Sequence, residues 1–321
     1  MKLFEFEKYY PTEESCRIKF RDIRMKEGVV CSKCGCTHHY WKTDKEMFQC
    51  KKCGHRQSLR ANTVMHGSKL PFRYWFIAMH LITATKHSFS AAELKRQLGH
   101  KRYQPIWELL HKLRSIMGQR DDKYTLSGSI ELDEGFFTTE IPDKQKNERL
   151  KAGVGSQRKT KVIVMAESAE ENNPRNINKP KKVGYIKMFV IPDLKSSTID
   201  DKAVNSISPD SCIITDASSS HHNFKNLFNE HKSQVISPKD IGKVLPWVHI
   251  AISNAKTLMA DIYHGVKAKF LQGYLNEYCY KFNRRYFGED LFERLMLIGI
   301  CYRTNFKHQI YNKKNESKLC L

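Results

Sequence analysis

The sequence predicts a mixed α/β protein in which a four-cysteine ribbon and a helical region precede a larger sheet domain. Near the N-terminus, two CxxC pairs are separated by fifteen residues. Helical spacing of apolar residues then dominates residues 61–120, and apolar strands separated by polar turns begin after residue 124. Further helical patterns follow residue 220, and this succession is typical of a mixed sheet flanked by helices.

The two CxxC pairs predict a metal site. Cys31 with Cys34, and Cys50 with Cys53, each form a knuckle that presents two thiolates, and four thiolates complete a tetrahedral zinc site. A glycine follows each knuckle, where a tight turn often needs positive φ. The sequence therefore predicts a structural Zn²⁺. Cys36 lies beside the first knuckle, outside the CxxC spacing.

The charge of the chain favours a polyanionic partner. Among 321 residues, 55 are Lys or Arg and 34 are Asp or Glu, which gives a net charge of +21. Neutralisation of phosphates by such a surface releases counterions, so DNA is the expected partner of the basic ribbon. Association with the ribosome, or solubility alone, is the alternative explanation of the positive net charge. For the ribbon, the alternative is a purely structural or protein-binding role.

The sequence carries no signal for a membrane or for export. No apolar run reaches the length of a membrane span, and the first residues lack the apolar region of a signal peptide. We therefore expect no membrane partner, a cytoplasmic location and reduced thiols among the ten cysteines. The predicted division is an N-terminal helical segment 1–28, a ribbon 29–60, a helical region 61–120, a sheet domain 121–304 and a polar tail 305–321.

Residues 90–117 have the pattern of a helix-turn-helix. Ser90 and Glu93 form a predicted capping box, Gly99 ends the first helix, and a second helix covers 103–117. Basic residues accompany both helices, and the hypothesis is that they grip a DNA duplex. The alternative is a helical hairpin with solvated charges. The basic residues are Lys95, Arg96, Lys101, Arg102, Lys112 and Arg114.

The sheet domain is predicted from four apolar strands. The predicted strands are 129–137, 161–166, 185–191 and 211–215, with a loop over 168–183; the predicted helices are 220–231, 247–261, 267–283 and 288–302. Asp133 lies within the first strand, and Asp216 follows the fourth. If these strands are neighbours, the two carboxylates converge, and hard oxygen ligands of this kind bind Mg²⁺ or Mn²⁺. Such a site supports two-metal phosphoryl transfer. Taken singly, each aspartate is an ordinary turn or surface residue.

Three further groups are candidates for binding. Residues 151–161 combine two glycines with cations that include Arg158 and Lys159, which predicts a contact with a phosphate backbone or a flexible hairpin tip. Arg284 and Arg285 end a long helix and either bind DNA or form salt bridges. The pair His221 and His222 follows three serines and is predicted to lie on the surface.

Several motifs together resemble a known family. They are residues 94–99, 107–114, Glu131-Leu-Asp-Glu134, Ile214-Thr-Asp216, and 263–266 through 274–285. Over residues 8–302 the chain resembles bacterial insertion-sequence transposases with an N-terminal zinc ribbon and a DDE-type catalytic domain. The resemblance implies an RNase-H-like fold, with Asp133 and Asp216 as the first two catalytic acids. It also implies binding to the terminal inverted repeats of the element and to target DNA, in a homodimer or larger assembly.

The third catalytic position departs from the general pattern of that family. The pattern has Glu on a helix followed seven residues later by Lys, and the matching positions are His249 and Lys256. Residues seven apart face the same way on a helix. The resemblance implies that His249 is a metal ligand, in a variant seen in some branches, and that Lys256 touches the DNA backbone. A site with two aspartates and a histidine should bind Mg²⁺ less tightly and tolerate Mn²⁺ better. The alternatives are an inactive copy or a misaligned third acid, for which Asp261 and Glu277 are the nearest candidates.

Two other functions remain open at this point. One is a DNA-binding protein that has lost or never uses catalysis, which the missing third acid favours. The other is a zinc-ribbon factor that binds RNA or the transcription machinery through a non-catalytic sheet domain.

Overall fold

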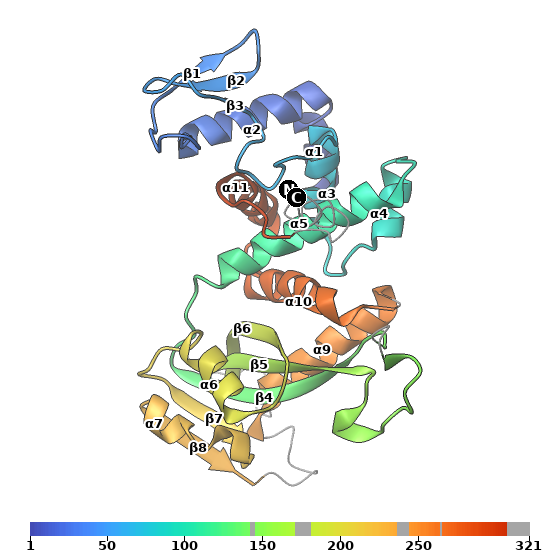
Figure 1. The fold of residues 1–321 in the computed structure, drawn as a ribbon, viewed down its shortest axis with the longest axis vertical. Helices are drawn as coiled ribbons and strands as arrows, with labels where there is room; N and C mark the ends of the chain where they lie inside the picture. The colour runs from blue at the N-terminus through green and yellow to red at the C-terminus, as the bar shows by residue number, and fades with distance from the viewer. Residues whose placement is uncertain (142–144, 171–180, 236–243, 264, 307–321) are drawn as a thin grey trace, which may run out of the picture. The chain divides into compact units, whose positions relative to one another are not determined.

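The computed structural model describes residues 1–141, 145–170, 181–235, 244–263 and 265–306 (Figure 1). The backbone divides into two compact units, each described by itself below. The first unit contains Met1–Gln119 and the described part of Tyr286–Leu321, and the sheet unit contains Arg120–Arg285. Across the described residues, no helix combines the length and the apolar character needed to cross a membrane.

The first unit is built on aromatic residues that helices bury. Its helices are α1 (Leu3–Tyr9), α2 (Glu13–Glu27), α3 (Phe72–Ala84), α4 (Ala91–Gln97), most of α5 (Tyr103–Asp121) and α11 (Leu291–Cys301). Thr12 caps α2, since its side chain accepts a hydrogen bond from the Ser15 amide at 3.1 Å. α11 packs against α2 and α3, where the Phe292 ring lies 6.2 Å from the Phe76 ring.

This placement of α11 differs from the predicted boundary at residue 304. The sequence pattern assigns the last helix to the sheet domain, whereas the structure assigns it to the first unit. The physical reason is that Leu295 and Met296 are fully buried there, and an apolar helix joins whichever core it can fill. Of the predicted tail 305–321, all but residues 305 and 306 lies outside the described residues.

The predicted ribbon and helical hairpin are present in the first unit. Strands β1 (His39–Lys42), β2 (Met47–Cys50) and β3 (Arg56–Ser58) form an antiparallel sheet in that order. Gly99 ends α4 with a φ of 61°. Ser90 accepts the amide of Glu93 at 3.1 Å. The Glu93 carboxylate bonds Arg96 and Gln97, so its contacts are within the helix.

The sheet unit contains five strands in the order β6-β5-β4-β7-β8. β4 (Ser129–Thr138), β5 (Lys159–Glu170) and β6 (Lys181–Ile191) form an antiparallel meander, and β7 (Cys212–Asp216) and β8 (Glu230–Gln234) add in parallel beside β4. Three antiparallel strands followed by two parallel ones in this order define the RNase-H-like fold. The fold class predicted from the sequence is therefore confirmed.

Helices cover both faces of the sheet, and the alternation of side chains assigns residues to each face. On one face, α9 (Pro246–Ile262) and α10 (Ala268–Asn283) enclose a core that includes Phe137 of β4. On the other face, α6 (Ser196–Val204) and the short α7 (Phe224–Leu227) pack over Ile130 and Leu132. Odd-numbered residues of β4 therefore face α9, and even-numbered residues face α6.

The helix predicted over residues 220–231 is wrong. The chain instead forms a 3-10 turn (Ser219–His221), then α7, and then β8. β8 reads Glu-His-Lys-Ser-Gln and has no apolar alternation, because it lies at the edge of the sheet and is specified by pairing with β7. β5 and β6 also extend into the predicted loop 168–183, of which residues 171–180 lie outside the described part of the chain.

Candidate functional site

The four predicted zinc ligands lie together in the first unit. One ligand atom from each of Cys31, Cys34, Cys50 and Cys53 lies within 4.8 Å of all the others. The sulfur atoms of Cys31 and Cys53, and those of Cys34 and Cys50, are 3.6 Å apart. Tetrahedral zinc with Zn–S bonds of about 2.3 Å places its sulfur ligands about 3.8 Å apart, so the four thiols fit a structural Zn²⁺.

The second candidate centre is where the carboxyl end of β7 meets the middle of its parallel neighbour β4. Ile130 pairs with Ile213 and Glu131 with Ile214, so the predicted condition that these strands are neighbours is met. Asp133 follows on β4, and Asp216 is the last residue of β7. Strand pairing thus brings together two carboxylates that are far apart in the sequence.

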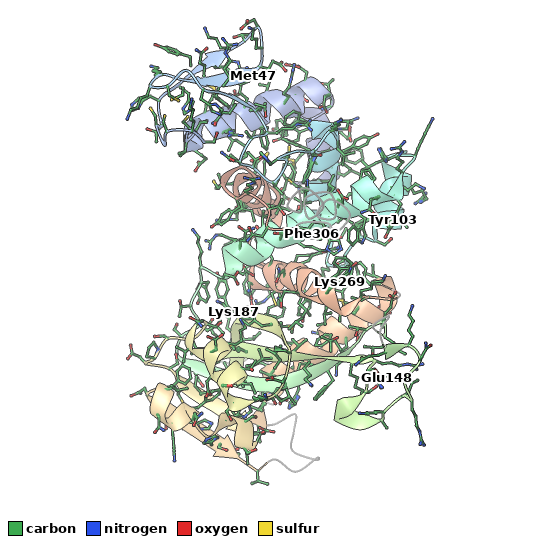
Figure 2. The ribbon with its side chains drawn as sticks, viewed as in Figure 1. Met47, Tyr103, Glu148, Lys187, Lys269 and Phe306 are labelled. Atoms are coloured by element: carbon green, nitrogen blue, oxygen red, sulfur yellow. The ribbon has the colours of Figure 1, made fainter. Side chains whose placement is uncertain are left out.

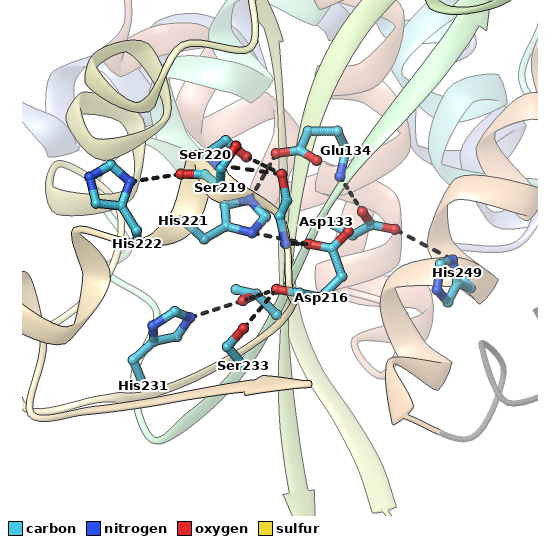
Figure 3. A network of polar contacts seen from close by, with 12 residues as sticks. Asp133, Glu134, Asp216, Ser219, Ser220, His221, His222, His231, Ser233 and His249 are labelled. Carbon is cyan, nitrogen blue, oxygen red and sulfur yellow. Dashed lines mark hydrogen bonds and ion pairs between the residues drawn. The ribbon is translucent and has the colours of Figure 1, made fainter. Parts of the chain in front are cut away.

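Helix α9 places His249 next to Asp133. The Nδ1 atom of His249 lies 3.6 Å from Oδ2 of Asp133, and Figure 3 shows the imidazole facing this carboxylate. The helix begins at Pro246, where the fixed φ of proline suits the first position of a helix. Two turns after His249, the ammonium of the exposed Lys256 lies 5.9 Å from the ring centroid of Phe137 on β4. The alternative acid Asp261 is exposed on the last turn of α9.

A buried glutamate sets where α9 begins. The Oε2 atom of Glu131 accepts hydrogen bonds from the backbone amides of Trp247 at 2.7 Å and Val248 at 3.1 Å. Glu131 is fully buried and faces α9 from β4, two residues before Asp133. A carboxylate at a helix N-terminus satisfies unpaired amides and favourably opposes the helix dipole. This contact fixes the start of α9 so that His249, one turn later, meets Asp133.

We expect Glu131→Ala to destabilise the sheet unit by about 1–3 kcal/mol, because a buried amide and a partly buried amide lose their acceptor. The measurement is urea unfolding followed by the fluorescence of Trp247, with the other three tryptophans replaced by Phe. Glu148→Ala is the matched control, because Glu148 is exposed in the connection between β4 and β5 (Figure 2). Equal stability of the two variants would contradict the capping role.

His221 is buried beside the carboxylates, so its predicted surface position is wrong. Its imidazole has no exposed area; Nε2 lies 2.8 Å from Oε1 of Glu134, and Nδ1 lies 3.2 Å from Oδ1 of Asp216. The structural reason is the 3-10 turn after β7, which directs the side chain inward onto Phe224. His222, its neighbour, is exposed as predicted. The sequence shows only a histidine five residues after a strand-end acid, with no local signal that its side chain is buried.

Burial and neighbouring charged groups together shift the pKa values of the site. Burial raises the pKa of Asp133 to about 6, and the negative charges of Glu134 and Asp216 add to this effect. Hydrogen bonding to His221 lowers the pKa of Asp216. Burial alone would lower the pKa of His221, but its contacts with Asp216 and Glu134 raise it to about 9. Burial lowers the pKa of His249, which favours the neutral imidazole that ligates metals.

The donor set is suitable for a hard divalent cation, although its atoms are not as closely gathered as the four thiols. Two carboxylates and a neutral imidazole are ligands that Mg²⁺ or Mn²⁺ accept. Among the described residues, however, the cysteine cluster is the group whose ligand atoms all lie within 4.8 Å. Oδ1 of Asp216 accepts the amide of Ser218 at 3.1 Å and faces His221, so this oxygen is already held by the protein.

The basic candidates of the helical hairpin differ in accessibility. Arg96, Lys101 and Arg102 are exposed around α4 and the start of α5, near Tyr103 (Figure 2), and Lys95 is partly exposed. The Arg96 guanidinium is paired with Glu93 at 2.6 Å. Arg114 is 1% exposed, so its predicted contact with DNA is wrong, and its side chain lies inside the core. Lys112 is also partly buried.

The two arginines at the end of α10 are held by the fold. Arg284 is 8% exposed and forms an ion pair with Asp121 at 2.6 Å, while its guanidinium lies 3.9 Å from the centroid of the Tyr280 ring. Arg285 donates to the carbonyl of Val183 at 2.7 Å. We therefore assign both to the structural alternative and not to DNA. Arg158 and Lys159, in contrast, are exposed where β5 begins.

Fold and site together define the class: a protein with a four-cysteine zinc ribbon and an RNase-H-like domain that carries one acid in the middle of β4 and one at the end of β7. Comparison with known families matches residues 125–283 to the ISXO2-like transposase domain and residues 11–56 to the transposase zinc-ribbon domain. The chain belongs to this transposase family.

Two further comparisons add little. No curated protein matches the chain. Among solved structures, a pre-cleavage Mos1 transpososome is similar over 74% of this chain and 82% of that chain, at 10% identity and a TM-score of 0.26. A similarity of this size carries no argument about fold or function.

Proposed function

We propose that this transposase binds the terminal inverted repeats of its own insertion sequence, cleaves the phosphodiester bond at the ends of the element and joins the freed 3′-hydroxyl to target DNA. The observation that carries the proposal is the meeting of three side chains: Asp133 from β4, Asp216 from β7 and His249 from α9. Membership of the family supports the same reaction class.

In this proposal, Asp133, Asp216 and His249 hold Mg²⁺ or Mn²⁺. Bound cations of this kind activate the attacking hydroxyl and stabilise the leaving oxygen in phosphoryl transfer. His249 contributes a neutral nitrogen, held 3.6 Å from Asp133 by the start of α9. Lys256 supplies a positive charge two turns further along the same helix face, where it can hold a phosphate of the bound strand.

In this proposal, the first unit and the start of β5 each supply a DNA-binding surface. The zinc ribbon presents basic side chains, and exposed cations surround the helical hairpin and begin β5. Contacts of this kind with phosphates position a protein on DNA without reading the sequence. The cations that we assign to DNA are Lys95, Arg96, Lys101, Arg102, Arg158 and Lys159.

The reaction has consequences for assembly and location. Joining both ends of an element requires two ends in one complex, so we propose a homodimer or larger assembly on DNA. We also propose that the protein acts in the cytoplasm, where the element DNA lies.

The experiment that tests the proposal is cleavage of labelled element ends by the full chain in Mn²⁺. Cleavage at the boundary of the repeat supports a transposase. Specific binding of the repeats without cleavage would favour the second candidate, a catalytically silent or domesticated DNA-binding protein. The observation in favour of that candidate is the histidine at the third position, where the family pattern has Glu.

We expect His249→Glu to retain or raise cleavage in Mg²⁺, because a carboxylate restores negative charge and a hard oxygen ligand. His249→Ala should lose at least about tenfold in cleavage at limiting metal, since a ligand is removed. Cleavage rates at several Mg²⁺ and Mn²⁺ concentrations provide the measurement.

Asp261→Asn separates this assignment from the misaligned alternative. Asp261 lies on the same helix, is exposed, and should tolerate the change with no effect on cleavage. Loss of cleavage in Asp261→Asn together with full activity in His249→Ala would move the third position to Asp261.

A further inference from the structure

His221 occupies a position that the proposed reaction does not use directly. It is fully buried, stacks on Phe224 at a centroid distance of 5.4 Å, and places one ring nitrogen against each of two carboxylates. A fully buried histidine between two acids needs an explanation, because one ring partners both carboxylates, of which Glu134 is 11% exposed and Asp216 is 40% exposed.

Asp133 and Glu134 are adjacent on β4, so their carboxylates lie on opposite faces of the sheet. Asp133 faces α9 and His249, and Glu134, the next residue of β4, points to the opposite face, as successive residues of a strand do. Figure 3 shows His221 and His249 on opposite sides of the two aspartates. His221 therefore connects Glu134, on the face away from α9, to Asp216, at the end of β7.

Asp216 needs such support because it is the last residue of its strand. Beyond it, the backbone leaves the sheet and enters the 3-10 turn. Its backbone carbonyl accepts the Ser233 hydroxyl at 3.2 Å, which anchors the main chain to β8. Among the described residues, the side chain is held through Oδ1, by the Ser218 amide and by His221. Without the imidazole, one backbone amide would remain on that oxygen among the contacts described.

We infer that His221 is a positioning residue that orients Asp216 for metal binding by bridging it to Glu134 across the end of the sheet. The inference rests on the proposed function, because Asp216 is a metal ligand only in that proposal. Partners behind a metal ligand fix its orientation, and their loss costs about 10–100-fold in metal affinity or activity. The second partner, Glu134, holds the ring itself in the orientation that reaches Asp216.

Two amide variants separate the two contacts of the ring. The side-chain nitrogen of Asn can occupy a position close to Nδ1 of His, and that of Gln a position close to Nε2. His221→Asn therefore retains a donor to Asp216, and His221→Gln retains a donor to Glu134. His221→Phe keeps the ring volume and the stacking on Phe224 but removes both polar contacts. His222→Ala is the matched control on the exposed neighbour.

The experiment measures the dissociation constant of Mn²⁺ for the zinc-loaded full chain by the loss of the free Mn²⁺ signal in electron paramagnetic resonance. We expect the dissociation constant to rise about 10–100-fold in His221→Phe and by about the same factor in His221→Gln. In His221→Asn and His222→Ala, it should stay within about threefold of the wild-type value. Cleavage of labelled ends should follow the same order, and thermal unfolding midpoints identify any variant that does not fold.

The order of the amide variants decides the inference even if His221→Phe fails to fold. The inference would be overturned if His221→Gln bound Mn²⁺ as tightly as His221→Asn or more tightly. An unchanged dissociation constant for Mn²⁺ in a folded His221→Phe would also overturn the inference. Asp216→Asn separates this failure from failure of the proposed function. If Asp216→Asn loses Mn²⁺ and the His221 variants do not, only the positioning role is wrong; if Asp216→Asn binds and cleaves normally, the proposed metal site is wrong.

Discussion

Replacing Asp133 or Asp216 with Asn is expected to lower strand cleavage on the order of a thousandfold while leaving the binding of element ends within about twofold. Each substitution keeps the size of the side chain and removes its negative charge, so the fold is retained while a cation loses a charged ligand. Asp133 is the more sensitive position, because it lies beside both His249 and the charges of Asp216 and Glu134.

Two measurements on the same variants check this prediction. Cleavage of labelled ends in Mn²⁺ gives the rate, and a gel-shift titration gives the affinity for the terminal repeat. Asp210→Asn is the matched control, because Asp210 is exposed two residues before β7. If the Asp133 and Asp216 variants lose binding and cleavage together, these residues have a structural role; if both variants cleave normally, the site lies elsewhere.

Cys34→Ser is expected to release the bound zinc and to weaken specific end binding by at least about tenfold. The ribbon has three short strands and a small core, so the binding of metal by four thiolates contributes much of its folding free energy, about 10–16 kcal/mol in zinc-finger peptides. A serine hydroxyl does not replace a thiolate as a zinc ligand. Once the ribbon unfolds, its basic side chains no longer form one surface.

Elemental analysis of the purified chain provides the measurement, with one zinc per wild-type chain expected. Cys36→Ser is the matched control, because Cys36 lies two residues away and contacts the amide of His38, outside the four-thiol cluster. If Cys36→Ser loses zinc and Cys34→Ser keeps it, Cys36 is the zinc ligand and Cys34 is not. Zinc kept by both single variants would refute the four-thiolate site.

Much of the site was predictable where the signal is local. The CxxC spacing predicts where the thiols lie, because each knuckle forms within four residues. The four thiols lie together, as this spacing predicts. The caps of α2 and α4 are equally local, since Thr12 and Ser90 each bond an amide three residues later. The position of Asp133 within a strand followed from apolar alternation alone.

Contacts between distant segments were not predictable in this way. Glu131 and His221 lie in unremarkable local sequence, and their roles depend on the start of α9 and on Glu134, which are 116 and 87 residues away respectively. Arg284 and Arg285 read equally well as DNA ligands or as structural cations, and only the packing of Asp121 and the β6 carbonyls against them favours the second.

The sequence by itself determined the zinc ligands, the order of ribbon, helices and sheet, and the two aspartates that resemble a catalytic pair, because each depends on spacing within a few residues or on apolar periodicity. Only the tertiary structure decided that the polar segment 230–234 is a strand, that α11 joins the first unit, and that His221 is buried between acids. The physical reason is that edge pairing, core filling and burial of charge are set by neighbours from elsewhere in the chain.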